Sequence, residues 1–287
     1  MNFKSYLILL RPANLVTAVA DILAGMAIVS FPWVKGGSLL ILASICLYAG
    51  GVVLNDYFDR NIDSIERPER PIPSGKVPSK HALYMGIFLF GMGLLFSFLY
   101  SEISFIISIS IVVFVITYNR FAKHHLVLGP FVMGLCRGLN LVLGMTILKS
   151  IPLTFVSLSV LPIFYIAAIT TISQNEVFGG GKIRFFIAGF LYLGVFCSQI
   201  IYSIYNHYFL YTFPFITLHS LILFPTLWRA IQNPSPTLIG KSVKTGVLTL
   251  ILLNASFAAA SGVIPIAILI LFLLPLSFLI AKYFAVT

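Results

Sequence analysis

Long apolar runs, each of about twenty residues, recur along the whole 287-residue chain with polar breaks between them. A helix needs about 20 apolar residues to cross a hydrocarbon core of about 30 Å, so each run is long enough to span a membrane. Runs this long favour helices, because barrel strands alternate in segments of about ten residues. The pattern predicts ten spans, at residues 12–33, 38–56, 81–100, 103–119, 126–148, 151–173, 183–205, 208–231, 242–260 and 262–284.

The breaks between these runs indicate one domain rather than several. Only Ser261–Gly262 separates the last two runs, so nine spans remain an alternative to ten. The first run follows Arg11–Pro12 and shows no small-residue cleavage site of a secretory signal. The pattern predicts an all-α protein, a polytopic transmembrane helical bundle of nine or ten spans, as a single domain over residues 1–287.

Composition supports the membrane interpretation and excludes several classes of protein. Apolar residues make up 59% of the chain and charged residues only 9%, against about 25% charged in an ordinary soluble domain. These values exclude a water-soluble globule, a disordered chain and a secreted disulfide scaffold. The three cysteines, Cys46, Cys136 and Cys197, lie in separate apolar runs without metal-ligand spacing, which is typical of small core residues.

The basic residues are distributed very unequally between the two sides of the predicted bundle. With ten spans, fifteen of the 18 lysines and arginines fall on the side that carries both termini. Lys35 and Lys149 fall on the other side, and Arg137 lies inside a span. This bias predicts a protein of the cytoplasmic (inner) membrane with both termini in the cytoplasm. It also explains the basic excess without any nucleic-acid partner.

The acidic residues gather in one short segment after the second predicted span. Only eight acids occur in the chain, and five of them lie between residues 56 and 69. Asn55, Asp59 and Asp63 are four residues apart, so on a helix they line one face over about 12 Å. Carboxylate and amide oxygens are the hard ligands that Mg²⁺ prefers, with water and substrate phosphate completing its shell.

A group of basic residues follows these acids directly. Acids beside bases suit a metal–diphosphate complex, because the acids hold the metal and the bases contact the remaining phosphate oxygens. An ordinary charged loop at the membrane surface is the simpler alternative, but such loops are usually basic and contain few acids. The bases are Arg67, Arg70, Lys76 and Lys80.

Three motifs resemble those of a known family. N-D-x-x-D-x-x-x-D followed by E-R-P-E-R-P-I-P-S-G, residues 55–75, strongly resembles the first aspartate-rich motif of the UbiA superfamily of intramembrane prenyltransferases. Arg11-Pro12-Ala13-Asn14 is similar to the family's R-P-x-N. Tyr118 and Lys123 are similar to its Y-x-x-x-x-K segment. The resemblance implies a helical bundle around a central cavity that opens sideways to membrane lipid.

The resemblance also implies an activity, a cofactor and partners. Such enzymes transfer a prenyl group from a polyprenyl diphosphate to an acceptor, with Mg²⁺ as cofactor. Mg²⁺ and bases stabilise the charge that develops on the leaving diphosphate. The catalytic residues implied are Asp59, Asp63, Arg67 and Lys123. The implied metal ligands are Asn55, Asp56, Asp59 and Asp63, and the implied substrate-binding residues are Asn14, Arg70, Tyr118, Arg137, Asn140, Ser173 and Glu176.

The chain departs from the family pattern at the end of the sixth predicted span. The family has a second aspartate motif there, whereas residues 170–182 read T-T-I-S-Q-N-E-V-F-G-G-G-K and contain no aspartate. Ser173, Asn175 and Glu176 are the candidate oxygen ligands. One hypothesis is that a second Mg²⁺ is lost or weakly held. The alternative is that Glu176 only ends the span in polar surroundings.

An internal echo suggests two related halves. L-L-R-P-A-N-L-V, residues 9–16, resembles L-C-R-G-L-N-L-V, residues 135–142. Arg137 and Asn140 are costly inside a span unless they face the cavity or a hydrogen-bond partner, and both alternatives stay open. The S-Q-N-E-V-F-G-G-G and M-G-L-C-R-G-L-N segments resemble the Ebo-type branch of UbiA-like proteins, which implies a branch with unassigned substrates.

The leading hypothesis is an intramembrane, Mg²⁺-dependent prenyltransferase, and two alternatives compete with it. The first is a non-catalytic carrier or transporter of a prenylated or diphosphate-bearing metabolite. The second is a terpene-cyclase-like lyase, which ionises the same donor without an acceptor. A quinone-ring precursor, a tetrapyrrole, a polyol and a glycerol lipid all remain open as the acceptor.

Overall fold

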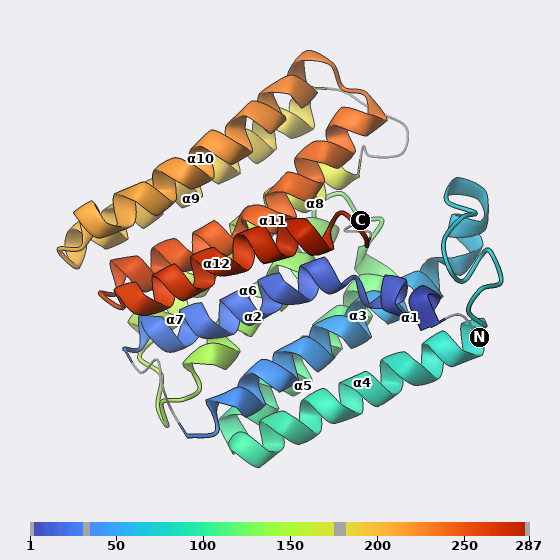
Figure 1. Ribbon diagram of the computed structural model, residues 1–287, viewed down its shortest axis with the longest axis horizontal. Helices are drawn as coiled ribbons and strands as arrows, with labels where there is room; N and C mark the ends of the chain where they lie inside the picture. Colours follow the sequence, from blue (N-terminus) through green and yellow to red (C-terminus); the bar gives the residue numbers. More distant parts are fainter. Residues whose placement is uncertain (1–2, 31–34, 175–181, 285–287) are drawn as a thin grey trace.

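The computed structural model describes residues 3–30, 35–174 and 182–284, and these residues form helices joined by turns, without a strand. The helices run alongside one another in a bundle (Figure 1). In chain order they are α1 (Phe3–Leu10), α2 (Pro12–Ile28), α3 (Gly37–Glu66), α4 (Ser79–Tyr100), α5 (Glu102–Thr117), η1 (Tyr118–Ala122), α6 (Leu128–Met145), α7 (Leu153–Val156), η2 (Ser157–Ser159), α8 (Val160–Ser173), α9 (Ile183–Tyr205), α10 (Phe209–Gln232), α11 (Pro236–Ala260) and α12 (Ile264–Ile280).

The helices of the described residues confirm the predicted all-α membrane bundle. Eight of them, counting joined segments as one, are long and apolar enough to cross a membrane, and there are nine if α1 and α2, which meet at a bend of 41°, count as one span. The helix α12 is apolar but shorter. The break at Ser261–Gly262 is present, because Gly262 turns the chain with a φ of 80° between α11 and α12. The chain is therefore an integral membrane protein whose described residues hold eight or nine candidate spans, where the sequence predicted nine or ten.

The helix α3 extends well beyond the predicted second span. We expected the span to end at residue 56, but α3 continues to Glu66. It stops there because Arg67 precedes Pro68, and a residue before proline is disfavoured in the helical region. Arg67 leaves the helical conformation, with a φ of −144° and a ψ of 59°. The acidic segment is consequently helical, as its spacing of four predicts, and the polar loop begins only after it.

Glycines bring α2 and α6 into backbone contact. A Cβ atom added to Gly25 would lie 2.3 Å from the carbonyl oxygen of Leu141, and one added to Gly144 would lie 2.4 Å from that of Ile22. Small residues at helix crossings allow this close approach in membrane proteins. The contact joins the two helices that carry the related segments 9–16 and 135–142, and it sets Asp21 of α2 beside Arg137 of α6.

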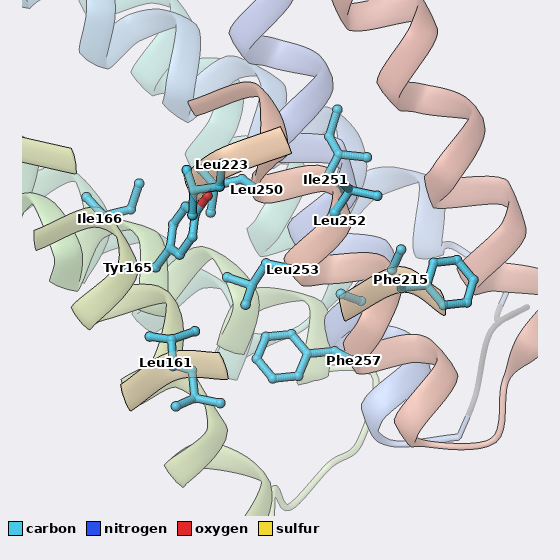
Figure 2. Packing of buried hydrophobic residues seen from close by; sticks show 14 of the residues in the cluster. Leu161, Tyr165, Ile166, Phe215, Leu223, Leu250, Ile251, Leu252, Leu253 and Phe257 are labelled. Atoms are coloured by element: carbon cyan, nitrogen blue, oxygen red, sulfur yellow. The ribbon is translucent and has the colours of Figure 1, made fainter. Parts of the chain in front are cut away.

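The largest apolar core surrounds α11, whose span is 89% buried within the protein. Tyr165 of α8 and Phe215 of α10 belong to this core together with Phe257 of α11 itself (Figure 2). The outer helices α4, α9 and α10 instead expose large apolar side chains, such as Phe88 and Phe190. Exposed apolar surface of this extent is suited to contact with lipid. Both termini and the segment between α3 and α4 lie toward the same end of the bundle (Figure 1).

Candidate functional site

A cavity of about 770 Å³ lies between the helices of the bundle, as the family resemblance implies. Its walls come from α2, α3, α5, α6, α8, α9 and α11. Apolar side chains cover much of the wall, among them Leu47, Ile111, Ile166, Val247 and Leu250. Charged side chains gather where α3 ends. The cavity therefore offers one polar region beside a region suited to a hydrocarbon chain.

The predicted face of α3 points into this cavity. Asn55, Asp59 and Asp63 all line it, as a spacing of four on a helix requires. Asp56 is one residue out of step and is not among the lining residues. Its carboxylate is instead held by Arg11 Nη2 at 2.6 Å and by Arg70 Nη1 at 3.4 Å. The structure thus separates Asp56 from the three residues that face the cavity.

Each aspartate at this end of α3 is paired with a base. Arg70 Nη1 lies 2.8 Å from Asp63 Oδ2, and Lys123 Nζ pairs with Asp59 Oδ2. Burial lowers the pKa of the Lys123 ammonium from its ordinary value, and the Asp59 carboxylate acts against that shift. We name this set the α3 cluster, and its members are Asp56, Asp59 and Asp63 with Arg11, Arg70 and Lys123.

Two local backbone features bring the bases of the α3 cluster into place. Arg11 lies in the bend between α1 and α2 with a φ of 47°, a left-handed conformation that is uncommon outside glycine. Lys123 follows η1, a π-helical turn that ends α5. Such turns occur often at functional sites. Arg11 was not among our predicted site residues, although its R-P-x-N motif gave a signal that could have identified it.

The amide of Asn55 also belongs to this region. Its Nδ2 donates to Asn119 Oδ1 at 2.9 Å. In the flipped orientation the same amide would donate to Asp59 Oδ2 at 3.2 Å and accept from Lys123 Nζ at 3.1 Å. The two orientations exchange the amide oxygen and nitrogen of Asn55. In either one, Asn55 lies within reach of the carboxylate and the ammonium that face the cavity.

A second charged group lies farther along the cavity and is almost fully enclosed. Arg137 Nε lies 2.7 Å from Asp21 Oδ2, and Asn140 Nδ2 donates to the same oxygen at 2.8 Å. Asn254 Nδ2 donates to Asp21 Oδ1 at 2.7 Å. Ser44 Oγ donates to Asn140 Oδ1 at 2.7 Å. We name these five residues the Asp21 network.

The sequence left open whether Arg137 and Asn140 face the cavity or a hydrogen-bond partner, and the structure shows both arrangements for each residue. Both residues line the cavity, and both are hydrogen-bonded or ion-paired within the bundle. Asp21 carried one usable signal in the sequence, because it is an acid in the middle of a predicted span. Asn254 carried none, because its partner lies 233 residues away.

Most of the other predicted site residues also line the cavity. Asn14, Tyr118, Arg67 and Ser173 line the cavity, and Ser173 Oγ donates to the Thr170 carbonyl at 2.9 Å. Glu176 lies outside the described residues. Lys76 and Lys80 are exposed and are not among the lining residues, so the structure does not bring these two bases to the cavity. The polar lining residues that we missed include Arg11, Tyr48, Glu66, Asn119, His124, Gln174 and Arg184.

The donor set of the cavity fits one Mg²⁺ ion. Within the described residues no group of three or more His, Cys, Asp or Glu side chains forms a metal site by itself. Mg²⁺ is commonly held by one or two carboxylates together with substrate phosphates and water. Asp59 and Asp63 supply the two carboxylates and Asn55 an amide oxygen, and nearby bases are placed to contact phosphate.

Comparison with known proteins places this site in a family. Residues 15–242 match the UbiA prenyltransferase family. Two relatives are named digeranylgeranylglyceryl phosphate synthase. The protein from Methanosphaera stadtmanae is 34% identical over 154 residues, which cover 53% of this chain and 55% of the relative. That from Methanosarcina mazei is 33% identical over 148 residues, covering 52% and 49%. The chain thus spans about half the length of these relatives.

Solved structures share the fold. A UbiA homologue from Aeropyrum pernix aligns with a TM-score of 0.68 at 14% identity, over 85% of this chain and 96% of that one. A UbiA homologue from Archaeoglobus fulgidus, bound to GPP and Mg²⁺, aligns with a TM-score of 0.59 at 17% identity, over 91% and 99%. The family match covers most of the chain and includes the α3 motif. The chain therefore belongs to the UbiA prenyltransferase family.

Proposed function

We propose that the protein is a Mg²⁺-dependent intramembrane prenyltransferase that uses a polyprenyl diphosphate as its donor. The observation that carries the proposal is the arrangement of Asn55, Asp59 and Asp63 on one helix face, inside a cavity that is otherwise largely apolar. The bases Arg70 and Lys123 already contact these acids. Family membership and the GPP and Mg²⁺ bound by the Archaeoglobus fulgidus homologue support the same assignment.

The α3 cluster is suited to exchange its partners when a donor binds. In the structure its carboxylates neutralise its bases. A metal–diphosphate complex carries both signs of charge, so Asp59 and Asp63 would turn to the metal while Arg70 and Lys123 contact phosphate oxygens. Arg67, which also lines the cavity, adds a further base on this side. Bound Mg²⁺ supplies positive charge that stabilises the leaving diphosphate.

The apolar wall has two tasks in the proposed reaction. Ionisation of an allylic diphosphate leaves a carbocation that water would destroy, so the reacting carbon must be shielded. Leu47, Ile111, Val115 and Leu250 line the cavity, and apolar side chains of this kind would keep water from the reacting carbon. The same surface holds the prenyl tail by burying it away from polar groups.

We propose a glycerol lipid with a free hydroxyl group as the acceptor to test first. The support comes from the names of the two relatives, which describe synthases of digeranylgeranylglyceryl phosphate. In the transfer, the acceptor oxygen forms a bond to the first prenyl carbon and the bond from that carbon to the diphosphate breaks. The hydroxyl proton leaves to a base and the electron pair leaves with diphosphate.

We further propose that the α3 cluster and both termini face the cytoplasm. The loop after α3 carries Arg67, Arg70, Lys76 and Lys80, and such basic segments remain on the cytoplasmic side. The termini lie toward the same end of the bundle as this loop (Figure 1). Accessibility of single cysteines introduced at Lys76 and at Lys149 to a membrane-impermeant reagent, in intact cells, tests the orientation. Labelling at Lys149 alone agrees with it, and labelling at Lys76 alone contradicts it.

The activity is tested with purified protein in detergent, geranylgeranyl diphosphate, geranylgeranylglyceryl phosphate and Mg²⁺. We expect prenylated product and released diphosphate in equal amounts, both abolished by a metal chelator. Release of diphosphate without any acceptor would point to a lyase. Saturable donor binding without turnover, over a panel of acceptors, would indicate a carrier, a function that none of the relatives named above is described as having.

A further inference from the structure

Arg137 lies in a different part of the cavity from the α3 cluster. Its guanidinium carbon is 5.5 Å from the centre of the Tyr48 ring. Tyr48 precedes Asn55 by seven residues on α3, which corresponds to about 10 Å along the helix. Arg137 therefore lies about two turns deeper than the residues that we assign to Mg²⁺ and diphosphate. Both Tyr48 and Arg137 line the cavity.

The guanidinium of Arg137 is held at one end and lacks a partner at the other. Asp21 Oδ2 lies 2.7 Å from its Nε. Its Nη2 is buried and has no hydrogen-bond partner within the part of the chain that the structure describes. The residue is only 5% exposed. A buried donor without a partner is costly, so such a group in a cavity wall indicates a ligand that accepts its hydrogen bond.

Within the Asp21 network, Arg137 is the residue with a buried N–H donor, at Nη2, that is still available for a hydrogen bond. The Asn140 amide donates to Asp21 Oδ2 at 2.8 Å and to the Ala18 carbonyl at 3.2 Å, while its oxygen accepts from Ser44. The Asn254 amide donates to Asp21 Oδ1 at 2.7 Å. These contacts fix Asp21 firmly against Arg137, so the terminal nitrogens of the guanidinium remain for a ligand in the cavity.

The charge of the Asp21 network determines which ligand fits. Asp21 is 1% exposed and Arg137 5% exposed, so the two opposite charges compensate each other away from water. An anionic ligand group would place a second negative charge next to Asp21, and the two anions would share the single positive charge of Arg137. A surplus negative charge is costly this far from water. A neutral oxygen satisfies the donor and adds no charge. Hydroxyl and ether oxygens meet this requirement.

We propose that Arg137 is a binding residue for the acceptor and donates a hydrogen bond to an uncharged oxygen of it, a hydroxyl or ether oxygen. The inference rests on the proposed function. It deepens that function by assigning the acceptor's neutral polar group to the Asp21 network, while any charged group of the acceptor belongs nearer the bases of the α3 cluster. Tyr48, which lies between the two regions on α3, contacts the same part of the ligand.

Two probes that differ in charge test this assignment. They are 1-O-hexadecylglycerol, which is neutral, and 1-O-hexadecylglyceryl phosphate, and their binding to the full-length protein in detergent is measured by calorimetry. Arg137→Met alone would strand the buried Asp21, so the test variant is Arg137→Met combined with Asp21→Asn, which keeps the network neutral. Asp21→Asn alone is the matched control, because it changes the network but retains Arg137. A thermal unfolding curve confirms that each variant is folded.

We expect the neutral probe to bind the wild-type protein and to lose at least tenfold in affinity in the double variant. Affinity for geranylgeranyl diphosphate with Mg²⁺ should change less than twofold in that variant, because the α3 cluster is intact. Asp21→Asn alone leaves Arg137 uncompensated, so its preference should shift toward the phosphate probe. If the single variant alone unfolds, the wild-type and double-variant measurements still decide the proposal.

Three results would overturn the proposal: a neutral probe that fails to bind the wild-type protein, equal binding of it by the double variant, or binding of the phosphate probe alone that depends on Arg137. Failure of the proposed function looks different. In that case the wild-type protein neither binds nor cleaves geranylgeranyl diphosphate, whatever residue stands at position 137.

Discussion

The α3 cluster and the Asp21 network both combine aspartates with bases, yet they are built differently. In the Asp21 network one carboxylate accepts from two amides and is ion-paired with an arginine, and both charged residues are nearly inaccessible. In the α3 cluster three carboxylates meet three bases that come from separate segments, and the pairs face the cavity or lie beside it. The first arrangement is a fixed brace between helices, and the second can exchange its partners for a ligand. The difference separates a fixed network, whose Arg137 we assign to the acceptor, from a set of ion pairs that a metal–diphosphate complex can open.

Asp59→Asn should have the largest effect on activity. The amide keeps the size of the side chain but loses the charge that holds a cation, so turnover should fall by about 100-fold or more. Diphosphate release is measured beside thermal unfolding in detergent, which shows whether the variant is folded. Glu102→Gln is the matched control, because this exposed acid at the start of α5 lies outside the cavity lining. Full activity of Asp59→Asn would remove the α3 cluster from the mechanism.

Asp21→Ala should instead act on stability. It leaves Arg137 charged and unpaired and removes the acceptor for Asn140 and Asn254. Breaking a buried pair in this way costs about 3–5 kcal/mol of unfolding free energy. Denaturant-induced unfolding in detergent measures the loss. A variant as stable as the wild-type protein would show that the network is not a brace.

Gly144→Ala should weaken the contact that places the Asp21 network. The added Cβ meets the Ile22 backbone, which moves only if α2 and α6 separate. Overpacking of this kind costs about 1–3 kcal/mol in unfolding free energy. Gly91→Ala on α4 is the control, because its Cβ would meet nothing within 4 Å. Equal stability of the two variants would argue against the close approach of α2 and α6.

Substitutions in the basic loop after α3 should have the smallest effects on donor affinity. They should also distinguish a base that contacts the α3 carboxylates from one that does not. Arg70→Ala removes a contact to Asp63 and Asp56 and should weaken donor binding about tenfold, the value of one hydrogen bond to a charged group. Lys76→Ala should leave donor affinity unchanged, because Lys76 is exposed and outside the cavity lining. Affinities for geranylgeranyl diphosphate with Mg²⁺ are compared by calorimetry. A similar loss in both variants would indicate a diffuse electrostatic effect.

The sequence predicted the bundle and the cavity face of α3 because both depend on local patterns. Span length follows from apolar runs, and the positions of Asn55, Asp59 and Asp63 follow from the helical repeat. The second apolar span was predicted to end at residue 56, whereas the helix α3 continues to Glu66, since a hydropathy pattern marks where the apolar surface ends rather than where the helix ends. The proline at position 68 was the better signal.

Other parts of the site could not be predicted because they depend on the packing of distant segments. Asp21 meets Arg137 only because Gly25 and Gly144 let α2 and α6 touch, and Asn254 reaches it from near the far end of the chain. Arg11 reaches Asp56 only because the chain bends between α1 and α2. The echo between segments 9–16 and 135–142 pointed to both arginines without showing that their partners differ.

One calorimetric comparison tests the central claim most directly. The wild-type protein and Asp59→Asn are each titrated with geranylgeranyl diphosphate, with and without Mg²⁺. The α3 cluster predicts tight binding by the wild-type protein only when Mg²⁺ is present, and at least a tenfold loss of that Mg²⁺-dependent affinity in Asp59→Asn. Binding that is independent of Mg²⁺, or equal in both proteins, would contradict the assignment of Asn55, Asp59 and Asp63 as the metal–diphosphate site.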